Sequence, residues 1–136
     1  MERCAEVETL LLEKYRLIRS GQPAGMDALI AAGDATLAVG TDPQEWWTGH
    51  SAVLAAVRAQ LEAIGGMAIE PGGPMGWREG PVAWFADRPT LNAEGTVIST
   101  RCTGVAVLQD GAWRAVQLHL SVGAANQDTF GTELPV

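Results

Sequence analysis

The spacing of apolar residues changes once along this chain, at Gly65-Gly66, and that change constrains the fold more than any other feature. Before it, apolar side chains recur at intervals of three or four residues, which is the pattern of amphipathic helices. After it, they recur at every second residue, which is the pattern of strands with one buried face. A chain that separates helices from strands in this way is predicted to fold as an α+β domain, with N-terminal helices packed on a strongly curved antiparallel sheet.

The segment before the change is predicted to begin with two helices and a short strand. The first helix covers residues 1–20 and ends at Gly21-Gln22-Pro23. The second covers residues 26–32, and the strand covers residues 35–39.

A turn sequence precedes the third helix. Asp42-Pro43-Gln44-Glu45 carries an acid at the cap position, proline at the first helical position and a second acid three residues after the cap, which are the parts of a capping box. We expect it to start one helical turn that carries Trp46 and Trp47. Ser51 is expected to cap the helix that follows, and Gly65-Gly66 ends that helix.

The segment after Gly66 is predicted to form antiparallel strands joined by tight turns. Asn92-Ala93-Glu94-Gly95 and Asp110-Gly111 are turn sequences. The tail after Asn126 has little periodicity and is expected to wrap the surface. The sheet should have at least four strands, over residues 66–80, 81–88, 96–108 and 113–123, the first of them broken by glycine and proline.

The length and the charge of the chain limit the classes of protein to which it can belong. A chain of 136 residues is expected to form one domain, over residues 1–136. Its net charge is −7 and it has no basic cluster, which argues against a nucleic-acid partner. No apolar run is long enough to span a membrane and the N-terminus does not read as a signal peptide, so we expect a cytoplasmic protein without membrane attachment.

The potential metal ligands are few and widely spaced. Cys4 and Cys102 form no ligand motif, and a reducing compartment would keep both as free thiols. His50 and His119 form neither an HxH nor an HExxH pattern. We therefore expect no metal and no other cofactor.

Three stretches resemble a known family: TDPQEWWTGHSAVLAAV, VAWFADR and DGAWRAVQLHLSVG, in that order along the chain. Together they resemble the SnoaL-like group of the nuclear transport factor 2-like superfamily, over roughly residues 5–126. The last stretch also resembles the end of the hub domain of calcium/calmodulin-dependent kinase II. The resemblance implies a cone, in which helices close the concave face of a bent sheet around a pocket. It also implies a homodimer formed through the outer face of the sheet.

His119 has two interpretations. Strand alternation places it with Trp113, Gln117 and Ser121 on one face, and Val116, Leu118, Leu120 and Val122 on the other. A neutral imidazole facing the pocket would be a candidate general base. In the hub, however, a pocket-facing arginine follows the corresponding histidine, and Leu120 takes its place here. That register turns His119 outward, as a structural group at a subunit interface.

The resemblance also bears on charge and on catalysis. The hub arginines that bind carboxylate correspond to Ala86, Gly104 and Leu120, so an anion held in the hub's manner is not expected. The base of ketosteroid isomerases corresponds to Val39, which cannot transfer a proton. Tyr15 lies near the oxyanion-donating tyrosine of those enzymes, and a packed core residue is its alternative interpretation.

These observations predict a protein that binds a small hydrophobic molecule in a largely apolar pocket. The alternative is an isomerase, cyclase or epoxide hydrolase acting on a polyketide- or terpene-like substrate, with His119 and Tyr15 as its candidate catalytic groups. A second alternative is an assembly module. The residues expected to form the ligand-binding wall are Trp47, Trp84, Cys102, Leu118 and Leu120.

Overall fold

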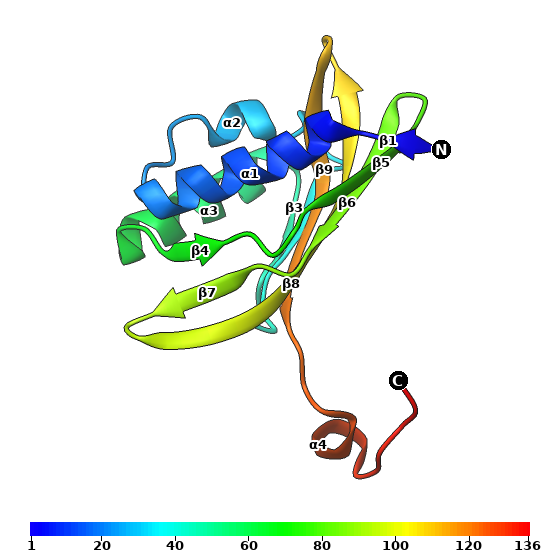
Figure 1. The fold of residues 1–136 in the computed structure, drawn as a ribbon. Helices are drawn as coiled ribbons and strands as arrows, with labels where there is room; N and C mark the ends of the chain where they lie inside the picture. Colours follow the sequence, from blue (N-terminus) through cyan, green and yellow to red (C-terminus); the bar gives the residue numbers. More distant parts are fainter.

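A computed structural model describes residues 1–136. The first three of its four helices cover one side of a strongly curved sheet (Figure 1). The helices are α1 (Ala5–Ser20), α2 (Met26–Leu29), α3 (His50–Ile64) and α4 (Asn126–Phe130). The strands are β1 (Glu2–Arg3), β2 (Leu37–Val39), β3 (Trp46–Thr48), β4 (Ala68–Glu70), β5 (Met75–Glu79), β6 (Val82–Asp87), β7 (Thr90–Ala93), β8 (Thr96–Gln109) and β9 (Ala112–Val122). The predicted α+β class is confirmed. None of the helices combines the length and the apolar composition needed to cross a lipid bilayer.

The nine strands form one mixed sheet in the order β1-β5-β6-β8-β9-β2-β3, with β4 joined through β7 to β8. Only the β2–β9 pairing is parallel. The long strand β8 pairs with β7 along its first part and with β6 along its second part. The sheet bends where β8 changes partner, which gives it the concave face that the helices cover (Figure 1).

Two helix ends meet at the glycines that stop them. Gly21 ends α1 and Gly65 ends α3, each with a left-handed backbone. A Cβ on Gly21 would lie 2.3 Å from the carbonyl oxygen of Gly65, so the two backbones touch directly. The Met67 N–H then donates to the carbonyl of Ile18 and ties the start of the β-rich half to α1.

The predicted helical turn at 43–47 is wrong. One of the two hydrogen bonds of a capping box forms, because Glu45 Oε1 accepts from the Asp42 N–H at 2.8 Å, whereas Asp42 Oδ1 accepts from the Gln44 N–H, also at 2.8 Å, and not from that of Glu45. The Gly40 N–H, however, donates to the carbonyl of Glu45 and closes a β2–β3 hairpin, so Trp46 continues as a strand. The local signals of a helix start serve here to shape a hairpin turn.

The start of α3 also differs from the prediction. Gly49 is its N-cap and no side chain caps it, so the role expected for Ser51 is wrong. His50 follows instead, with Nδ1 at 3.0 Å from the Ala31 carbonyl and Nε2 at 2.8 Å from Asp27 Oδ1. These contacts fasten the first turn of α3 to the α2 region.

The alternation of β9 shifts once. Ala106 pairs with Ala115 whereas Val105 pairs with Gln117, so Val116 is an extra residue and forms a β-bulge. Trp113 therefore packs on the same core as Leu118 and Leu120, and its predicted placement on the face of His119 is wrong.

Two buried clusters form the core. The larger joins α1 to the sheet, and the smaller joins the C-terminal end of α1 to α2, α3 and β2. Ile18 and Leu118 pack against both. The tail does not wrap the surface as expected: α4 buries no residue and extends away from the sheet, with Phe130 65% exposed (Figure 1).

Candidate functional site

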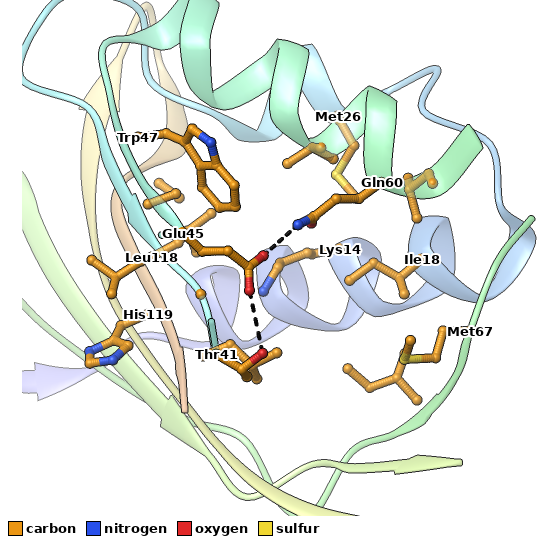
Figure 2. A pocket seen from close by; sticks show the side chains of 18 of the residues that line it. Lys14, Ile18, Met26, Thr41, Glu45, Trp47, Gln60, Met67, Leu118 and His119 are labelled. Carbon is orange, nitrogen blue, oxygen red and sulfur yellow. Dashed lines mark hydrogen bonds between the residues drawn. The ribbon is translucent and has the colours of Figure 1, made fainter. Parts of the chain in front are cut away.

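A cavity of about 420 Å³ lies where the two core clusters meet, between the helices and the concave face of the sheet. Of the 24 residues that line it, 18 are hydrophobic, so its wall is largely apolar. Helices α1 and α3 supply Leu10, Ile18, Val57 and Leu61. Figure 2 shows Ile18 on one side of the cavity and Leu118 of β9 on the opposite side. Volumes of several hundred Å³ are usual for small-molecule sites.

Two positions of the cavity wall on the sheet carry small side chains. Ala38 of β2 and Ala115 of β9 face the cavity and are almost fully buried. Ile64, at the end of α3, lines the cavity and is nearly half exposed, so the cavity reaches the surface beside it.

Glu45 is the only acid in the wall, and neighbouring donors hold it (Figure 2). Its Oε1 accepts the Asp42 N–H at 2.8 Å and the Thr41 hydroxyl at 3.4 Å. Its Oε2 accepts from the Gln60 side chain of α3. The carboxylate thus links the β2–β3 turn to α3 at the edge of the cavity.

Lys14 is the only basic residue in the wall other than a histidine. It comes from α1 one helical turn after Leu10 and one turn before Ile18, so it interrupts an apolar stripe. Its ammonium donates to Cys102 Sγ at 3.7 Å, which is a weak hydrogen bond. None of the five ion pairs of the chain includes Lys14, although its side chain and that of Glu45 extend into the same cavity (Figure 2).

Three of the five residues expected in the ligand-binding wall line the cavity. Trp47 reaches it from the β2–β3 hairpin, and Leu118 and Leu120 reach it from β9 (Figure 2). The bulge at Val116 sets the register that turns both leucines inward.

Trp84 and Cys102 lie elsewhere, and their predicted position in the wall is corrected. Trp84 sits on β6 between Ala83 and Phe85, which are both buried in the core, so its own side chain points to the outer face. It pairs there with Trp77 of β5. Cys102 is fully buried behind the wall, where it meets Lys14.

His119 borders the cavity from between two inward-facing leucines. It pairs in register with Thr103 on one side and Val39 on the other. No carboxylate lies within ion-pair distance of its imidazole, because the chain's only histidine–carboxylate contact belongs to His50. The geometry therefore provides no acid to orient His119 as a general base.

Tyr15 is fully buried and lies outside the cavity wall. Its hydroxyl donates to Asp87 Oδ2 at 3.0 Å, and Asp87 also accepts the N–H groups of Gly72 and Arg88. Burial, together with the nearby Cys102 and Asp87, raises the pKa of Tyr15 well above its usual range. A neutral tyrosine held by a buried carboxylate is a structural group.

The sequence did not predict Lys14, Glu45 and Gln60 as cavity residues, nor Asp87 as the partner of Tyr15. One signal was available for Lys14, since a lysine at the i+4 position between Leu10 and Ile18 must share their face. Glu45 gave none, because the turn it closes explained it. No group of three or more His, Cys, Asp or Glu side chains comes together as a metal site.

One family model matches most of the chain. The sequence profile of the SnoaL-like domain matches residues 7–125. No curated protein matches the sequence.

Solved structures share the fold at low identity. A protein of the NTF2-like class from Pseudomonas putida KT2440, of unknown function, is 20% identical with a TM-score of 0.78, over 96% of this chain and 92% of its own. A candidate calcium/calmodulin-dependent protein kinase type II association domain from Thiobacillus denitrificans is 20% identical with a TM-score of 0.73, over 86% and 94%. A candidate dehydratase of the NTF2-like family from Streptomyces avermitilis is 14% identical with a TM-score of 0.78, over 89% and 96%. At these identities the likeness establishes the fold alone.

Proposed function

The chain belongs to the SnoaL-like domain family, and from this premise we propose that it binds small hydrophobic molecules in the cavity between α1, α3 and the sheet. The observation that carries the proposal is the cavity itself: about 420 Å³, walled mainly by aliphatic side chains and open at the end of α3. Displacing water from such a wall favours an apolar ligand by roughly 25 cal/mol for each Å² of apolar surface covered.

The cavity also weighs against a module that serves assembly alone. A cone that acts only as a scaffold gains stability when side chains fill its interior, because empty apolar space forfeits packing contacts. Here Ala38 and Ala115 stand at two positions of the wall where larger side chains would fill part of the cavity.

An enzyme of the isomerase, cyclase, epoxide-hydrolase or dehydratase kind is the second candidate. It is favoured by Lys14 and Glu45, two titratable groups in one apolar cavity, and by the candidate dehydratase of the same fold. It is disfavoured by the three donors already bound to Glu45, since a proton-transferring carboxylate needs access to its substrate. Turnover of a hydrophobic β-hydroxycarbonyl compound that is lost in Glu45→Gln would favour this candidate.

Binding is tested with Nile red, a neutral dye whose emission reports a change to apolar surroundings. Wild type should bind it, whereas Leu120→Arg should lose binding because an unpaired charge in an apolar cavity is costly to desolvate. Leu108→Arg is the matched control, since Leu108 is exposed and outside the wall. Leu118→Trp fills the cavity without adding charge and should also lose binding.

The remaining control concerns His119. His119→Ala should leave Nile red binding largely intact, because the imidazole only borders the cavity. Thermal melts of each variant separate loss of binding from loss of fold. Equal dye binding by wild type and a folded Leu120→Arg variant would refute the proposed site.

A further inference from the structure

We propose that Lys14 is a headgroup anchor, and that the cavity's ligands are hydrophobic molecules ending in a carboxylate. The inference rests on the proposed function and adds the polar part of the ligand to it. The cation comes from helix α1. The positions that match the hub arginines, Ala86, Gly104 and Leu120, all lie on strands, so this anchor differs in place from those of the hub.

The Lys14 ammonium has only a weak hydrogen-bond acceptor within the chain. Lys14 is half-buried in a wall of aliphatic side chains, and its hydrogen bond to the Cys102 sulfur is long and weak. An ammonium carries three donors, and removing it from water is costly unless a charged partner replaces the water. The other cations of α1 have oxygen partners: Arg16 pairs with Glu13, and Arg19 donates to the Ile69 carbonyl.

The one acid of the cavity wall, Glu45, is held by other groups. Glu45 does not pair with Lys14 within 4.0 Å, and three donors from its own turn and from α3 hold its oxygens at the cavity edge. These hydrogen bonds stabilise the charge of the Glu45 carboxylate in that position. A ligand carboxylate that reaches Lys14 would therefore be a stronger hydrogen-bond acceptor for the ammonium than the Cys102 sulfur.

The position of Lys14 on α1 suits a ligand that has a charged headgroup and a hydrocarbon body. Lys14 lies between Leu10 and Ile18 on one face of α1, and both leucine and isoleucine line the same cavity. A ligand carboxylate at Lys14 therefore has apolar wall on both sides along the helix for a hydrocarbon body. A charge-assisted hydrogen bond from an ammonium to a carboxylate is stronger than one to a neutral ester oxygen.

The test compares decanoate with its methyl ester, each displacing Nile red from the wild type and from variants. Wild type should bind decanoate more tightly than the ester. Lys14→Met keeps the length of the side chain without its charge, and should weaken decanoate binding by roughly 10- to 100-fold, as expected for a hydrogen bond between charged groups, while changing ester binding little. Lys14→Arg should retain most of the preference.

Two further variants sharpen the test. Arg16→Met removes an exposed cation from the same helix outside the wall, and should leave the preference unchanged. Glu45→Gln removes the opposing charge and should tighten decanoate binding.

The outcomes separate the two proposals. If Nile red binds but the wild type does not prefer decanoate, or Lys14→Met keeps that preference, the anchor is refuted and the binding function stands. Weaker decanoate binding in Glu45→Gln would also contradict the anchor, because it would make Glu45 a ligand-binding group. If wild type binds neither the dye nor decanoate, both proposals fail.

Discussion

Tyr15→Phe should destabilise the protein without touching its cavity. The hydroxyl of this fully buried residue donates at 3.0 Å to Asp87, a carboxylate that is 5% exposed. A hydrogen bond to a charged group contributes about 1.5–3 kcal/mol, and the variant leaves Asp87 with only the N–H groups of Gly72 and Arg88. We expect a loss of about 2 kcal/mol in the free energy of unfolding at neutral pH.

The same residue should make the protein sensitive to alkali. Burial raises the pKa of Tyr15 in the folded state, so the unfolded chain loses its tyrosine proton first, from about pH 10 upward. Stability from the neutral tyrosine is complete below that pH and falls as the pH rises further, by up to about 1.4 kcal/mol per pH unit. Tyr15→Phe should not show this fall in the free energy of unfolding, because it has no group at this position to ionise.

Urea unfolding followed by tryptophan fluorescence measures both effects. Tyr15 is the only tyrosine of the chain, so tyrosinate absorbance reports its ionisation directly. Asp87→Asn and the double variant complete a cycle that isolates the pair. A loss below about 0.5 kcal/mol at neutral pH, or a folded protein whose tyrosine ionises near its ordinary pKa, would refute the reasoning.

Two other predictions concern the sheet. Gly104→Ala should lower the free energy of unfolding by about 1–3 kcal/mol in urea, because its Cβ would lie 2.3 Å from the Phe85 ring and 2.6 Å from the Gln117 carbonyl; an unchanged midpoint would contradict that packing. We also propose that a second copy covers the outer face, where Trp84 pairs with Trp77 and where Trp46 is 63% exposed. Light scattering should then give twice the chain mass of 14.3 kDa for wild type and the single mass for Trp84→Glu, whereas a monomeric wild type would refute the dimer.

The long helices and strands were predictable because burial of one face imposes its period on the sequence. Helices α1 and α3 follow that rule closely. The turn at Asp42 was not predictable in the same way, since its capping hydrogen bonds suit a helix or a hairpin equally. The pairing of Gly40 with Glu45, set by strand β2, decided between them.

The candidate site was predictable where alternation had polar residues to mark a face. In β9, the polar residues Gln117, His119 and Ser121 alternate with leucines, so Leu118 and Leu120 could be turned inward. In β6 the run Val-Ala-Trp-Phe-Ala is apolar on both faces, and nothing in it marks which one holds Trp84. The β9 bulge was equally hidden, because an extra residue is visible only against the partner strand.

The distribution of side-chain size across the sheet links the cavity to the outer face. A chain selected only for a full core would turn its tryptophans inward, because they bury the most apolar surface. Here Trp77 and Trp84 point outward, while Ala38 and Ala115 line the cavity on the concave face. The inner alanines leave room that a ligand can fill, and the outer tryptophans offer apolar area that water would otherwise cover. Both surfaces gain stability only when another molecule is added, so a bound ligand and a second copy are the two additions that this sheet favours.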